Sequence, residues 1–80
     1  MQTAQVHNRY GEQRPAFGAW LLAQHDRGDW IDGLARVARL DPLFPRNGDF
    51  EAVRERLEAK GADGDAFAAL EDAELHWLTY

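Results

Sequence analysis

Apolar residues recur every three or four positions along most of this chain, which is the period of a helix with one buried face. The first such stripe follows Pro15, a residue suited to the first turn of a helix, and contains Phe17, Trp20 and Leu21. The stripe stops at Gly28, a residue type that commonly ends helices in the left-handed conformation. The pattern therefore predicts a first helix between Pro15 and Gly28.

A second helix is predicted to begin near Trp30, with Asp29 as its N-cap residue. Asp41-Pro42 ends it, because the residue before a proline avoids the helical conformation. Gly33 lies inside this helix, and we expect a close approach between helices to explain a residue that weakens helices. The expected buried face follows the spacing i, i+3, i+4, i+7 and consists of Ile31, Leu34, Ala35 and Ala38.

Residues 41–49 form the predicted connector to the third helix. Two prolines restrict its backbone, and Asn47-Gly48 supplies a turn. Leu43 and Phe44 lie inside the connector. We expect both to fill the core, because two exposed side chains of this size would leave an adhesive apolar patch.

Two further helices are predicted in the last part of the chain, and no alternating run predicts a strand. The third helix spans about residues 50–60, with Asp49 as its N-cap and Gly61 at its end. The fourth spans about 66–78 and follows a turn whose aspartates can cap it. The predicted core consists of Phe17, Trp20, Leu21, Ile31, Leu34, Ala35, Phe44, Phe50, Val53, Leu57, Phe67, Leu70 and Trp77.

The order and spacing of these residues resemble the YozE-type domain of small bacterial proteins. The pattern that carries the resemblance is Phe17-x-x-Trp20-Leu21-x-x-Gln24-x-x-Arg27-x-Asp29-x-Ile31, then Leu34-Ala35, Asp41-x-x-Phe44-Pro45, Phe50, Val53, Leu57 and Trp77-x-x-Tyr80. This chain departs from the family at Asp32-Gly33, where the family tends to have Gly-Asp. The resemblance implies a fold like that of the sterile alpha motif (SAM), with Trp77 and Tyr80 packed on the first helix. It implies no activity.

Residues 1–15 show neither the helical nor the strand period. We therefore expect a flexible N-terminal arm, followed by one SAM-like helical domain over residues 16–80. An arm that becomes ordered on a partner through Arg9, Tyr10 and Arg14 is the alternative.

Composition narrows the class of protein. Eighty residues allow one domain, and the absence of cysteine excludes a disulfide framework and a thiolate metal site. No window approaches the roughly 18 apolar residues that a membrane-spanning helix needs, and residues 1–15 contain no apolar leader stretch. We therefore expect a cytoplasmic bacterial protein that does not associate with membranes.

Few side chains are available for catalysis. There is no serine or cysteine, and the aliphatic hydroxyls Thr3 and Thr79 lie near the two ends of the sequence, where no base would be held in register. A carboxylate pair for acid–base catalysis would need an apolar cleft, and no glycine-rich phosphate loop occurs. We expect neither an enzyme nor a bound cofactor.

Metal binding is not expected either. The three histidines have none of the spacings of zinc sites. The pair Asp63 and Asp65 is similar to the start of a calcium loop but lacks the later ligands. Solvated helix ends are the interpretation we adopt for two possible donor sets, which are His25 with Asp26 and Asp29, and His76 with Glu71, Asp72 and Glu74.

Charge is distributed unevenly along the chain. The net charge is −5, yet residues 1–47 carry six arginines against five acidic residues, and residues 48–80 carry three basic residues against nine acidic ones. The acidic residues predict a solvated face, or alternatively a surface for a basic partner or for head-to-tail self-association. The candidate acidic partner face comprises Glu51, Glu55, Glu58, Glu71, Asp72 and Glu74.

Nucleic-acid binding is the main rival function. Two helices with a short junction are typical of helix-turn-helix geometry, and arginines on the second helix and its neighbouring loops would contact phosphates. The negative net charge disfavours this function, and pairing with local acids, such as Arg36 with Asp32, is the other interpretation of these arginines. The candidate contacts for nucleic acid or an acidic partner are Arg27, Arg36, Arg39 and Arg46.

The sequence thus predicts an all-α protein, a compact four-helix SAM-like bundle with a flexible N-terminal tail. We expect a non-enzymatic binding module for an unknown protein partner, present as a monomer or with weak head-to-tail self-association. Nucleic-acid binding is the alternative.

Overall fold

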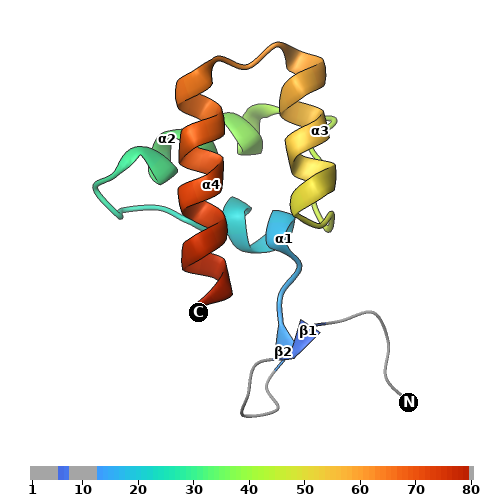
Figure 1. Ribbon diagram of the computed structural model, residues 1–80, viewed down its shortest axis with the longest axis vertical. Helices are drawn as coiled ribbons and strands as arrows, with labels where there is room; N and C mark the ends of the chain where they lie inside the picture. Colours follow the sequence, from blue (N-terminus) through green and yellow to red (C-terminus); the bar gives the residue numbers. More distant parts are fainter. Residues whose placement is uncertain (1–5, 8–12, 80) are drawn as a thin grey trace.

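A computed structural model describes residues 6–7 and 13–79, and it confirms the all-α fold with four helices. Figure 1 shows α3 and α4 side by side, with α2 passing behind α4. α1 and α4 each pack against the three other helices of the bundle. The helices are α1 (Phe17–Leu22), α2 (Trp30–Leu40), α3 (Phe50–Lys60) and α4 (Gly64–Leu78).

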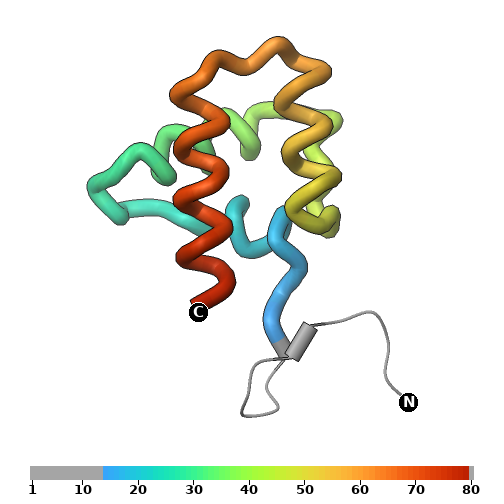
Figure 2. The backbone as a smooth tube through the Cα atoms, in the orientation of Figure 1, coloured from blue at the N-terminus to red at the C-terminus, as the bar shows by residue number. Residues whose placement is uncertain are grey.

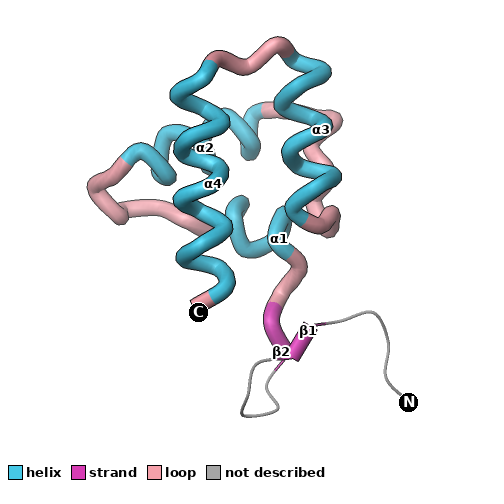
Figure 3. Tube along the Cα trace, in the orientation of Figure 1, coloured by secondary structure: helices cyan, strands magenta, loops and turns pink. Residues whose placement is uncertain are grey.

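Part of the predicted N-terminal arm forms a short antiparallel pair of strands, β1 (Val6–His7) and β2 (Gln13–Arg14). Figure 3 shows this pair apart from the four helices. The hydrophobic pattern does not predict these two-residue strands. The prediction that Arg9 and Tyr10 order on a partner falls outside the described residues.

α1 is shorter than predicted, because it ends at Leu22 instead of continuing toward Gly28. The amide of Gln24 donates a hydrogen bond back to the Trp20 carbonyl at 2.9 Å. The guanidinium of Arg39 donates to the carbonyls of Leu22 and Gln24, both at 2.9 Å. These side chains satisfy carbonyls that a longer helix would have paired with its own backbone.

The three longer helices each begin with an aspartate cap, as the sequence predicts. The carboxylates of Asp29, Asp49 and Asp63 accept a hydrogen bond from a backbone N–H two or three residues further on. The predicted bounds of α2 and α3 are confirmed, including the left-handed Gly61 that ends α3. α4 begins at Gly64, two residues earlier than predicted, because Asp63 is the aspartate that caps it.

An aromatic cluster forms the centre of the core. Phe17 is completely buried, and its ring lies 5.9 Å from that of Trp20, 5.5 Å from that of Phe50 and 5.8 Å from that of Trp77, measured between centroids. The indole N–H of Trp77 donates to the Pro15 carbonyl at 2.9 Å. Figure 2 shows α1 at the end of the bundle where α4 finishes. The predicted packing of Trp77 on the first helix is therefore confirmed.

Every residue of the predicted core is buried or packs partly buried against it. The prediction for the connector is only half right, because Phe44 is buried whereas Leu43 is 70% exposed. The carboxylate of Asp41 accepts from the backbone N–H of Leu43 at 3.0 Å, which fixes a turn with the Leu43 side chain outside. The predicted packing of Tyr80 falls outside the described residues. Ala38 is buried, as its place on the expected inner face of α2 predicts, and Ala69 and Ala73 are buried although the predicted core does not include them.

α1 also lies unusually close to the connector between α2 and α3. The Gly18 N–H donates to the Gly48 carbonyl at 2.9 Å. A Cβ atom at Gly18 would collide with the Pro45 carbonyl oxygen, so only glycine fits at this contact. Among the described residues, no helix is both long enough and apolar enough to cross a lipid bilayer.

Candidate functional site

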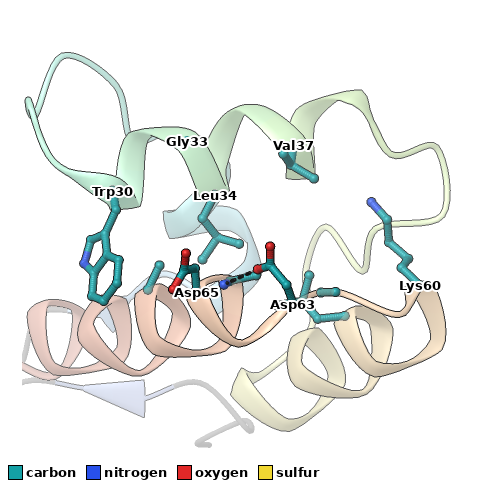
Figure 4. A pocket seen from close by; sticks show the side chains of 11 residues that line it. Trp30, Gly33, Leu34, Val37, Lys60, Asp63 and Asp65 are labelled. Atoms are coloured by element: carbon teal, nitrogen blue, oxygen red, sulfur yellow. Dashed lines mark hydrogen bonds between the residues drawn. The ribbon is translucent and has the colours of Figure 1, made fainter.

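A groove of about 460 Å³ lies between α2 and the first half of α4, and the end of α3 closes one side of it (Figure 4). Its floor consists of side chains that also belong to the core, among them Leu34, Leu57 and Ala69. Trp30 and Val37 form the rim on α2, and they are 49% and 47% exposed. The groove is therefore an extension of the core that opens to solvent.

The rim belongs to a second apolar face on α2. Besides its buried face, this helix carries an outer stripe, which we define as Trp30, Gly33, Val37 and Leu40. The positions are three, four and three residues apart, so they lie on one side of the helix. Leu40 is 77% exposed. A helix that only covers its own core needs one apolar face, so the outer stripe is apolar surface beyond what the core requires.

Gly33 is open to solvent at the middle of the outer stripe. The sequence predicts a close approach between helices at this glycine, and that prediction is wrong within the chain. A Cβ atom added to Gly33 would meet nothing within 4 Å. The glycine instead leaves a gap between Trp30 and Val37 on the rim of the groove.

The groove has an acidic side where α4 begins. Asp63 and Asp65 are both exposed there, and Asp63 also caps the helix (Figure 4). The basic residue that lines the groove is Lys60, whose ammonium lies 3.6 Å from the buried Asp41 carboxylate. The exposed charge along the α4 side of the groove is therefore negative.

Trp30 is held in place by a hydrogen bond between helices. Its indole N–H donates to the carboxylate of Asp72, on α4, at 3.1 Å. The sequence pattern predicts Asp72 on an acidic face but does not predict the groove. The sequence does contain a signal for this apolar surface, which is the helical spacing of Trp30, Val37 and Leu40 outside the predicted buried face.

Two of the four candidate arginines are used within the fold. Arg27 bonds to the Gln24 amide at 2.9 Å, to the Asp29 carboxylate at 3.3 Å and to the His76 ring at 3.0 Å. Arg39 binds the carbonyls at the end of α1, as described above. Both guanidinium groups therefore position the segment between α1 and α2.

The other two candidates, Arg36 and Arg46, are exposed and form no ion pair within the part of the chain that the structure describes. The predicted pairing of Arg36 with Asp32 is wrong. The Asp32 carboxylate instead accepts from the backbone N–H groups of Arg27 and Gly28, both at 2.8 Å. Asp32 therefore stabilises the turn before α2.

The candidate acidic face is partly neutralised. Arg54 pairs with Glu51 at 2.9 Å and with Glu58 at 2.6 Å, and these carboxylates raise the pKa of its guanidinium. Asp72 is engaged by the indole on α2. The three members that form no ion pair with any described residue are Glu55, Glu71 and Glu74.

Neither set of candidate metal donors converges. Within residues 6–7 and 13–79, no group of three or more histidine and acidic side chains is placed to hold a metal ion. His25 contacts the carboxylate of Asp26 at 3.0 Å, and both side chains are exposed. His76 lies 3.9 Å from Asp72 and turns its other ring nitrogen toward Arg27.

No protein-family model, curated protein or solved structure matches this chain. The resemblance to the YozE-type family and the SAM-like character of the bundle therefore stay predictions from the sequence.

Proposed function

We propose that this protein is a non-enzymatic binding module that contacts other proteins through the groove and the outer stripe of α2. The observation that carries the proposal is the second apolar face of α2, because Trp30, Val37 and Leu40 stay exposed beside an apolar groove. Contiguous apolar surface of this kind is typical of protein contact sites. We retain the cytoplasmic location expected from the sequence as part of this proposal.

The proposal is tested by affinity capture with the parent protein and with a Val37→Glu variant. Val37 is about half exposed, so the substitution leaves the core intact, which circular dichroism checks. We expect the parent protein to retain binding partners that the variant does not retain. Added copies of the same chain should be among these partners. Glu55→Lys, an exposed change on α3, is the matched control and should retain them. Identical binding by parent and Val37→Glu would contradict the proposal.

The nucleic-acid alternative now depends on two exposed arginines, Arg36 and Arg46, since the other two candidates bind groups within the fold. An amide NMR titration with mixed-sequence duplex DNA at low and physiological salt tests it. Shifts near both arginines that fade with salt would support it. An unchanged spectrum at low salt would exclude it.

Head-to-tail self-association through opposite charges also stays a prediction. Glu51 and Glu58 are paired with Arg54, which weakens the acidic side of such a contact. For this reason we base the proposed function on the apolar groove.

A further inference from the structure

We infer that the occupant of the groove is α2 of a second copy of this chain, packed in parallel about a twofold axis. This inference rests on the proposed function and names the partner. Its basis is that one helix carries both an apolar stripe and unpaired charge, while the groove beside it carries the opposite charge.

The two flanks of the outer stripe differ in charge. Successive residues of a helix are rotated by about 100°, so Leu34 lies on the flank toward the groove and Arg36 lies on the opposite flank. The groove flank leads to the exposed carboxylates of Asp63 and Asp65 at the start of α4. The other flank carries the exposed guanidinium of Arg36, which forms no ion pair with a described residue.

A twofold axis parallel to α2 joins unlike flanks. This axis places the outer stripe of one copy against the outer stripe of the other. It also places the groove flank of each copy beside the Arg36 flank of its partner. Arg36 and Leu40 of the second copy then lie over the groove of the first, near Asp65. An antiparallel pair would place the acidic flanks of the two copies on the same side, where they repel. Charge complementarity therefore selects the parallel pair.

Gly33 and Leu40 acquire a role in this arrangement. In a parallel pair of helices, residues at the same position face each other across the axis. The open space at Gly33 lets the two helices approach at the centre of the stripe. Leu40, which has the highest exposed fraction among the large apolar residues that the structure describes, becomes covered.

The contact is small, so the dimer is weak. Two helices of eleven residues bury less than the ~1,600 Å² of a standard protein interface. We therefore expect half of the protein to be dimeric at roughly 0.1–1 mM, and less at high salt. Sedimentation equilibrium at low salt measures this, and a monomer at millimolar concentration would overturn the inference.

Disulfide trapping tests the register, since the chain contains no cysteine of its own. Gly33→Cys should form a covalent dimer under mild oxidation, at least about tenfold faster than Glu55→Cys on the exposed face of α3. Mixing Gly33→Cys with Val37→Cys should give few mixed dimers. Preferential mixed dimers would show an antiparallel pair, and equal rates for Gly33→Cys and Glu55→Cys would contradict the contact.

Charge reversal tests the inferred contact between Arg36 of one copy and Asp65 of the other. Arg36→Glu and Asp65→Lys should each weaken the dimer at least about threefold, because two ion pairs are lost per dimer. The double variant exchanges the charges and should restore the dissociation constant to within about twofold of the parent. Arg46→Glu, with the same change of net charge on the exposed connector, is the control and should have no such effect. If Arg36→Glu and Arg46→Glu weaken the dimer equally, the inference is wrong.

The two proposals fail separately. A monomeric protein that still captures another protein, in a manner sensitive to Val37→Glu, would overturn the second copy as the occupant and retain the binding function. A monomeric protein whose captured proteins are unaffected by Val37→Glu would overturn both.

Discussion

Arg56 donates two hydrogen bonds to the buried carboxylate of Asp41, at 2.7 Å and 2.8 Å. Asp41 ends α2 and Arg56 lies in the second half of α3, so this bidentate pair joins two helices. The guanidinium holds the pKa of Asp41 well below its usual range, with further contributions from the Leu43 N–H and from Lys60. The same bonds raise the pKa of Arg56.

The ion pair makes stability depend on pH on the acid side. An unfolded aspartate has a pKa of about 3.9, and the folded pKa of Asp41 is lower. Its contribution to stability is therefore complete above about pH 5 and is lost as pH falls through 4 toward the folded pKa. Asp41→Asn should lower the Tm at pH 7 and flatten the fall of Tm between about pH 5 and pH 2. Thermal unfolding followed by circular dichroism measures both effects.

Glu55→Gln is the control for the fall of Tm at acid pH. Glu55 is exposed and forms no ion pair with a described residue, so its removal should leave the curve of Tm against pH nearly parallel to that of the parent. If the Tm of Asp41→Asn falls with pH as steeply as that of the parent, the pair of Asp41 and Arg56 does not set the pH dependence of stability.

Two helix glycines should respond oppositely to alanine. Gly18→Ala introduces a Cβ atom against the Pro45 carbonyl and should destabilise the protein by about 1–3 kcal/mol. Gly33→Ala enters open space inside α2 and should stabilise it by about 0.5–1 kcal/mol. Urea unfolding at micromolar protein concentration measures both. Equal effects of the two substitutions would contradict the contact between α1 and the connector.

Phe17 should be the most sensitive core position. Its replacement by alanine removes one ring from three aromatic contacts and should cost about 3–5 kcal/mol. Because small domains have only about 5–15 kcal/mol of stability, a large fraction of Phe17→Ala should be unfolded in mild urea. Leu43→Ala, at an exposed position, should change stability by less than about 0.5 kcal/mol. A large loss for Leu43→Ala would indicate that this side chain is covered in solution.

Two substitutions at Asp49 separate the hydrogen bond that caps α3 from the charge of the capping carboxylate. Asp49→Ala removes the side-chain acceptor for the Ala52 N–H and should cost about 1 kcal/mol, whereas Asp49→Ser keeps an acceptor and should cost less. Chemical denaturation of the two variants gives the comparison. A serine variant as unstable as the alanine variant would assign the effect to the carboxylate charge at the helix N-terminus.

The bounds of α2 and α3 could be predicted because their signals are local. Asp29 and Asp49 cap their helices from the adjacent position, and Gly61 ends α3 with its own backbone conformation. The core could be predicted because residues spaced for one face of a helix had one available direction to pack. Neither inference required knowledge of distant contacts.

The misjudged features depend on partners far away in the sequence. The early end of α1 depends on Arg39, which reaches its last carbonyls from another helix. The exposure of Leu43 is a local exception, because it depends on a turn set by Asp41, two residues earlier. The outer stripe was not recognised because the buried face already accounted for the helical period of α2, and only the packing of α1 and α4 shows that Trp30, Val37 and Leu40 stay exposed.

The aromatic cluster also fixes when the bundle can be completed during synthesis. Trp77 and Pro15 are 62 residues apart and share a hydrogen bond, and the same indole closes over Phe17. While the chain emerges from the ribosome, α2 and α3 can pack against α1 before α4 is made, but the side of Phe17 that Trp77 covers stays open until α4 is available. The order of translation therefore makes the closing of this core a late event, although α1 is made first.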